Sequence, residues 1–118
     1  MRKSILRDKS YVFAIEIVKL VQQLQNESRE FVLSKQLLRS GTAIGALVAE
    51  SEFSESKADF AHKLSIALKE ANETKYWLAL LSDTNYISNI VFTECHAKCV
   101  ELIKILVTSI KTSKSQKH

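Results

Sequence analysis

The side chains best suited to metal or redox chemistry are Cys95, His96 and Cys99, which lie within little more than one helical turn of each other. A structural zinc site needs four such ligands, and the sequence contains no second pair of cysteines. Both cysteines also fall on the apolar row of their segment, where a reduced cysteine packs as a small hydrophobic side chain. The pattern favours a place in the core for Cys95 and Cys99.

One half of a ferritin-like motif occurs at Asp59 and His62. Ferritin-like bundles hold two metal ions through two Glu-x-x-His motifs and two further glutamates, and the rest of that set is missing here. A lone motif of this kind at a helix start is more typical of a cap with a surface histidine. His96 and His118 likewise have no serine or thiolate partner at a strained turn. We expect no enzymatic activity, no metal and no cofactor.

Two glycines in the segment GTAIG raise the question of a phosphate-binding loop. That motif follows a strand and ends in Lys-Ser or Lys-Thr, and neither feature is present. Gly41, Gly45 and Ala49 are instead spaced four apart, which stacks them into a shallow groove on one face of a helix. Each glycine inside a helix costs roughly 1 kcal/mol relative to alanine, which predicts a second helix lying close against the groove.

Two charged residues, Arg39 and Glu50, occur on the otherwise apolar segment that holds the glycines. Eleven residues apart, they lie about three turns from each other along nearly one face, too far for a direct bond. We expect each to find its partner on the helix at 56–83 or on another subunit. A phosphate contact is the alternative for Arg39.

Basic residues gather at the two ends of the chain, which has a formal net charge of +4 and a pI near 9.1. With Arg39, these end residues are the candidate nucleic-acid contacts: Arg2, Lys3, Arg7, Lys9, Lys111, Lys114 and Lys117. Acidic residues gather instead between the second and third predicted helices, at Glu50, Glu52, Glu55 and Asp59.

Length and composition predict one globular domain over residues 1–118, with 46% hydrophobic and 25% charged residues and no proline. No run approaches the roughly 20 apolar residues of a membrane span, and the first twenty residues do not resemble a signal peptide. We expect a cytoplasmic protein with no membrane contact.

Apolar periodicity predicts four helices, at about 8–26, 34–52, 56–83 and 88–112, with a disordered basic tail at 111–118. Ser34, Ser56 and Ser88 are the predicted caps of the last three helices. Short connections imply an all-α, antiparallel, up-down-up-down four-helix bundle, with both ends and the connection between the second and third helices at one pole.

The helix at 56–83 is the expected partner of the glycine groove, because its inward row has small side chains at Ala67 and Ala71. Tyr76 and Trp77 diverge by about 100° on the same helix. One of them is therefore expected in the core and the other against a neighbouring subunit.

The segments QLLRSGTAIGALVAE and SKADFAHKLSIALKEANETKYWLALL resemble the small four-helix bundle proteins encoded by intervening sequences of bacterial 23S ribosomal RNA genes. A relative of that family is the accessory variability determinant of diversity-generating retroelements. The resemblance covers about residues 8–112. It is carried by Gln36, Arg39, Ile44, Ala49, Glu50, Asp59, Phe60, Lys63, Leu64, Ala67, Glu70, Glu73, Tyr76, Trp77 and Leu78.

That resemblance implies a four-helix bundle in a ring-like homopentamer, without enzymatic activity, whose partner is nucleic acid or a nucleic-acid-handling protein. This chain departs from the family at Ala43 and Leu47, where relatives often have Ser and Asn, so it lacks two polar groups beside the groove. We therefore expect an oligomeric, non-enzymatic protein that binds RNA or DNA. The alternative is a protein-interaction scaffold whose basic ends meet an acidic partner protein.

Overall fold

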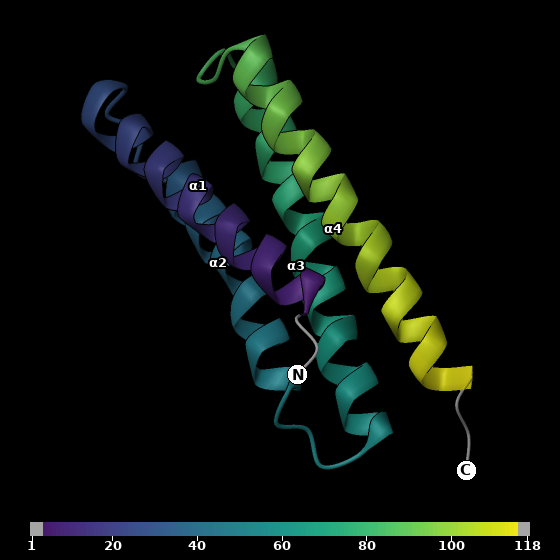
Figure 1. Cartoon of the computed structure of the whole chain (residues 1–118). Coiled ribbons are helices and arrows are strands. Elements are labelled where there is room, and N and C mark those ends of the chain that lie inside the picture. Colours follow the sequence, from purple (N-terminus) through teal and green to yellow (C-terminus); the bar gives the residue numbers. More distant parts are fainter. Residues whose placement is uncertain (1–3, 116–118) are drawn as a thin grey trace.

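A computed structural model describes residues 4–115, and these residues form four antiparallel helices joined by short connections (Figure 1). The helices are α1 (Ile5–Glu27), α2 (Leu33–Ser51), α3 (Lys57–Asp83) and α4 (Asn89–Ser115). The predicted all-α, up-down-up-down four-helix bundle is confirmed. No helix within this described part is long and apolar enough to cross a bilayer.

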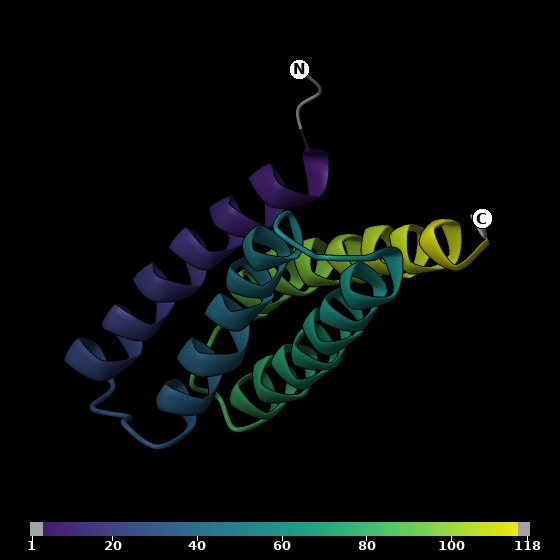
Figure 2. The ribbon, with the colours of Figure 1, turned by 90° about the horizontal axis from the view of Figure 1, so that it is seen from below.

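Consecutive helices share the main interfaces, whereas α1 and α4 touch much less extensively. Figure 1 and Figure 2 both place α1 at the edge of the assembly, packed chiefly on α2. The start of α1, the α2–α3 connection and the end of α4 lie at one pole, as expected. Arg7 on α1 pairs there with Glu52, and the Ser113 hydroxyl on α4 donates to the Lys57 carbonyl.

One hydrophobic core runs the length of the bundle and takes side chains from all four helices. Trp77 packs against this core, as expected for one of the two rings, while its neighbour Tyr76 is 60% exposed. The two rings do not diverge fully, because they meet edge to face with their centroids 5.0 Å apart. Side chains with almost no exposed surface include Phe13, Ile17, Leu24, Leu37, Ile44, Leu64, Leu78, Leu81, Leu102 and Leu106.

Two of the three predicted caps are confirmed. The Ser56 hydroxyl accepts from the backbone N–H of Asp59, and the Ser88 hydroxyl accepts from the N–H of Val91. The prediction for Ser34 is wrong, because Ser34 is buried inside the first turn of α2. The free amides of that turn are satisfied by a carboxylate, as described next.

The Glu30 carboxylate caps α2 by accepting from the backbone N–H groups of Val32, Leu33 and Ser34, at 3.1, 3.0 and 2.7 Å. Arg29 immediately before it has φ of 55°, the left-handed conformation that ends α1 and turns the chain toward α2. The Glu30 carboxylate, four residues before Ser34, is therefore the N-terminal cap of α2 that the sequence analysis assigned to the Ser34 hydroxyl.

The helix at each end of the chain is longer than its apolar pattern predicted. α1 starts at Ile5, with the Ser4 hydroxyl accepting from the N–H of Arg7. α4 continues to Ser115, so the prediction of a disordered tail is wrong for residues 111–115. Residues 116–118 lie outside the described part.

Gly41 and Gly45 do form a close helix contact, but its partner is α1 and not α3. A Cβ atom added at Gly41 would lie 2.9 Å from Cγ2 of Ile17, and one at Gly45 would lie 3.1 Å from the Ser10 carbonyl oxygen. The expectation failed because both glycines lie on the flank of α2 that meets α1, beside its core row of Leu37, Ile44 and Val48. Ala49 is exposed and takes no part in the groove.

The small side chains on α3 meet α4. The Sγ of Cys99 donates to the carbonyl oxygen of Ala71 at 3.2 Å, and Ala67 and Ala71 are fully buried. The small side chain of Ala71 lets Cys99 of α4 reach the backbone of α3, which is a different contact from the one that the glycines make.

Candidate nucleic-acid interface

Five of the eight candidate contacts lie in the described part of the chain. Arg2, Lys3 and Lys117 fall outside it. The remaining five do not form one surface: Arg7 and Lys9 are on α1, Arg39 is on α2, and Lys111 and Lys114 are on the last turns of α4.

Both candidates on α1 are engaged by acids of the same chain. The Arg7 guanidinium lies 3.1 Å from the Glu52 carboxylate, and the Lys9 ammonium lies 3.1 Å from that of Glu101. Lys9 faces a cleft between α1 and α4, whose other flank is bridged by a pair between Lys98 and Glu16 at 2.7 Å. These ion pairs link α1 to the α2–α3 connection and to α4. A phosphate could bind Arg7 or Lys9 only in competition with the carboxylate that already pairs with it.

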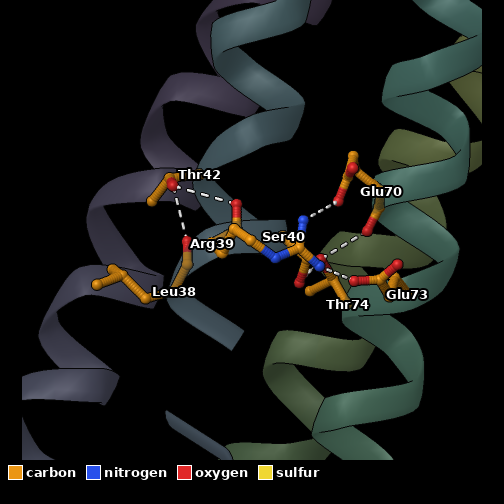
Figure 3. Close-up of polar contacts among 7 residues, drawn as sticks. All are labelled: Leu38, Arg39, Ser40, Thr42, Glu70, Glu73 and Thr74. Carbon is orange, nitrogen blue, oxygen red and sulfur yellow. Dashed lines mark hydrogen bonds and ion pairs between the residues drawn. The ribbon is translucent and has the colours of Figure 1, made fainter. Parts of the chain in front are cut away.

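Arg39 reaches across from α2 to two glutamates on α3 (Figure 3). One guanidinium nitrogen lies 3.1 Å from Glu70, and the other is paired with Glu73. Beneath it, the Thr74 hydroxyl donates to the Ser40 hydroxyl at 3.0 Å in the buried interface. The expected partner on the third helix is therefore confirmed for Arg39, which ties α2 to α3.

Glu50, the other charged residue of that face, is exposed. Its carboxylate makes no hydrogen bond or ion pair among residues 4–115. On α3, Asp59 and Lys63 form an ion pair at 3.0 Å. Lys69 lies four residues before Glu73, but Glu73 pairs with Arg39 of α2 instead.

We expect Arg39→Met to lower the free energy of unfolding by about 1 kcal/mol, because it leaves two carboxylates one turn apart without their cation. Glu70 is only 14% exposed, which makes its loss of a partner the larger part of the effect. Chemical denaturation measures the change. Lys35→Met, which removes an exposed cation from the same helix one turn earlier, should leave stability nearly unchanged.

Lys111 and Lys114 are exposed and make no ion pair within the described residues. Lys104, which sequence reasoning did not select, lies seven residues before Lys111 and is also exposed. On a helix these three lysines fall within an arc of roughly 80°. We call them the α4 basic face. The α4 basic face could have been found in the sequence by its lack of acidic residues, since residues 102–118 contain neither Asp nor Glu.

The cysteines belong to the core, as predicted. Cys99 is fully buried, and burial raises the pKa of its thiol to about 12, so it stays protonated at neutral pH. Burial also raises the pKa of the Cys95 thiol, with nearby Glu16 adding to the shift. Residues 4–115 hold no cluster of three or more His, Cys, Asp or Glu side chains that could bind a metal ion.

Comparison with known proteins identifies the family. The model of the 23S rRNA-intervening sequence protein family matches residues 2–108. The chain belongs to this family. A similar solved structure is a protein of unknown function from the S23 ribosomal protein family of Bacteroides thetaiotaomicron, with a TM-score of 0.90 and 51% identity. That match covers 91% of this chain and 99% of the other. No curated protein matches.

Membership in the 23S rRNA-intervening sequence protein family accounts for the bundle and for its core. The match to the family model ends at residue 108, before Lys111 and Lys114.

Proposed function

We propose that this protein is a non-enzymatic, homo-oligomeric accessory protein that binds RNA or DNA through the α4 basic face. One observation carries the proposal: Lys104, Lys111 and Lys114 lie on one side of a helix whose sequence has no acid after Glu101. Phosphate groups are recognised chiefly by such unpaired cations. The name of the family, which refers to 23S rRNA, agrees with a role beside nucleic acid.

Hydroxyl groups near the lysines support the same proposal. The last three turns of α4 carry Thr108, Ser109 and Thr112, which line a shallow cleft with Phe60 at the start of α3. Hydroxyl groups commonly donate to phosphate oxygens and position a nucleic-acid backbone without reading its sequence. Binding of this type should be weakly selective for sequence and strongly dependent on salt.

We expect the protein to retard RNA and duplex DNA of mixed sequence at about 50 mM salt, where phosphate contacts are strongest. The double substitution Lys111→Gln and Lys114→Gln should weaken retention and make the slope of log K against log salt shallower by roughly two for duplex DNA. Point substitutions are preferable to removing residues 111–118, since that truncation would take away the last helical turn.

Lys35→Gln with Lys69→Gln is the matched control, because it removes the same charge from exposed positions on α2 and α3. Equal losses in the two double variants would show that only net charge matters and that the α4 basic face is not the site. No retention by the full chain at low salt would leave the alternative, a scaffold that binds an acidic protein.

The scaffold alternative depends on the same basic surface. Arg7, Lys9 and Arg39 are all paired with acids of the same chain, which reduces the cationic surface offered to phosphates and to an acidic partner protein alike. Oligomerisation belongs to either proposal, and the ring-like homopentamer implied by the family resemblance stays a prediction, as does the cytoplasmic location. Repetition of the α4 basic face around such a ring would multiply a modest charge per chain.

A further inference from the structure

The start of α3 and the last turns of α4 border a cleft of about 350 Å³, which we call the α3–α4 cleft. Figure 1 shows both segments at the same pole of the bundle. Phe60 is the one aromatic side chain of its lining, and the ring also packs against the hydrophobic core. Ligand clefts usually measure roughly 300–1,000 Å³, so this one has room for a single ring system and not for a large ligand.

The hydroxyl groups that line this cleft are available to a ligand. Within residues 4–115, those of Thr108, Ser109 and Thr112 make no hydrogen bond. Hydroxyl groups on helices elsewhere in the bundle bond the carbonyl group four residues earlier, as those of Thr42 and Ser65 do. The three cleft hydroxyls instead keep their donor and acceptor capacity for a bound molecule.

The charges around the cleft suit an anion. Among residues 4–115, no acidic side chain lines it, in contrast to the cleft between α1 and α4, whose lining includes Glu16 and Glu101. Asp59, which precedes Phe60 in the chain, is engaged by Lys63 at 3.0 Å. A negatively charged ligand therefore meets no unpaired carboxylate within the cleft.

Thr108 connects the α3–α4 cleft to the α4 basic face. Along the helix it lies about 6 Å from Lys104 and about 4.5 Å from Lys111, and around the helix it lies within roughly 60° of each. A nucleic-acid strand held by these lysines therefore passes the mouth of the cleft. An unpaired base of that strand can turn into the cleft, whereas a base in a duplex must first leave its stack, which costs free energy.

We propose that the α3–α4 cleft takes one unpaired base of a single-stranded RNA or DNA, which stacks on Phe60 while the α4 basic face binds the flanking phosphates. This inference rests on the proposed function and names the form of nucleic acid that the protein prefers. Sites for single strands commonly combine a basic surface that follows the backbone with an aromatic ring on which a base stacks. A ring that already packs against the core loses little freedom when a base binds.

The test compares an oligodeoxythymidine of about 16 nucleotides with a mixed-sequence duplex of equal length, at salt concentrations from about 50 mM upward. Phe60→Leu keeps an apolar side chain but removes the ring. It should lower the ratio of single-strand to duplex affinity about tenfold and leave the salt slope for the single strand unchanged, because stacking releases no counterions. Phe60→Tyr, which keeps a ring, should retain the ratio. An oligouridine of equal length should show the same loss, since stacking does not involve the sugar.

Three further variants make the result specific. Phe53→Leu is the matched control, because Phe53 is 84% exposed but lies in the α2–α3 connection, and it should keep the ratio. Lys111→Gln with Lys114→Gln should lower both affinities. In Phe60→Trp, the single strand should quench the added indole fluorescence and the duplex should not, after subtraction of the signal from Trp77, the one tryptophan of the unmodified chain.

An unchanged affinity ratio in Phe60→Leu, whether both affinities fall equally or neither falls, overturns this inference and leaves the α4 basic face as a phosphate-binding site. Equal quenching of Phe60→Trp by the two ligands overturns it as well. If the unmodified protein retains neither ligand at low salt, the proposed function fails and this inference fails with it. Circular dichroism confirms that each variant keeps its helices.

Discussion

Gly45→Leu is expected to lower the free energy of unfolding by about 3 kcal/mol or more, one of the largest effects of any single substitution in this protein. The atom that a new Cβ would meet is the Ser10 carbonyl oxygen, 3.1 Å away in the backbone of α1. A backbone atom cannot rotate aside as a side chain can, so a leucine forces α1 and α2 apart along their whole interface. Denaturant unfolding followed by circular dichroism measures the loss.

Two neighbouring substitutions make that result specific. Ala46→Leu adds a leucine one residue further along α2 on its exposed face and should be nearly neutral. Gly45→Ala gains roughly 1 kcal/mol in helix propensity and loses a comparable amount to the tight contact, so it should change stability little. A clear stabilisation by Gly45→Ala would mean that α1 and α2 can accommodate a methyl group at Gly45, and would contradict a close contact there.

Glu30→Ala should cost about 2 kcal/mol, because it leaves three backbone N–H groups at the start of α2 without an acceptor. Glu30 is only 9% exposed, so water cannot fully replace the lost carboxylate. The same unfolding measurement applies. Glu27→Ala is the matched control, since Glu27 is an exposed glutamate whose side chain, among residues 4–115, accepts only from Gln23.

The Glu30 cap also makes stability depend on pH. Burial tends to raise the pKa of Glu30, but the bonds from Leu33, Ser34 and Val32 together outweigh it and hold the pKa below its ordinary value. A carboxyl whose pKa is lower in the folded state stabilises the fold above its unfolded-state pKa and loses that contribution as pH falls through the folded pKa. Glu30→Gln should therefore be less sensitive to acid below about pH 4.5 than the unmodified protein. Equal acid sensitivity in the two proteins would contradict this role.

The fold could be predicted from the sequence because apolar periodicity and short connections constrain a four-helix chain strongly. The partner of the glycine groove could not be predicted, because helical spacing shows which residues share a face but does not show which neighbouring helix that face meets. The cap of α2 was missed for a related reason: Glu30 becomes an acceptor only after Arg29 adopts a left-handed conformation, which its residue type does not suggest.

The basic candidates show the limit of charge as a guide to binding. Counting cations near the two ends selected Arg7 and Lys9, whose partners Glu52 and Glu101 are distant in sequence and become visible only in the folded bundle. For Arg39 the sequence limited the partner to the third helix, another subunit or a phosphate, because its own helix offers no acid within reach; the structure selects α3. Lys104 was overlooked because it is a single lysine among apolar residues. It becomes a candidate contact only when α4 places it on the same side of the helix as Lys111.

The sparse contact between α1 and α4 bears on how the chain folds. Nearly all of the tertiary structure joins helices that are adjacent in sequence, and the one interface that would close the longest loop is the smallest. Proteins with such local topology fold quickly, since little chain entropy is lost before contacts form. We therefore expect each helical hairpin to form early, from contacts between helices that are adjacent in the sequence.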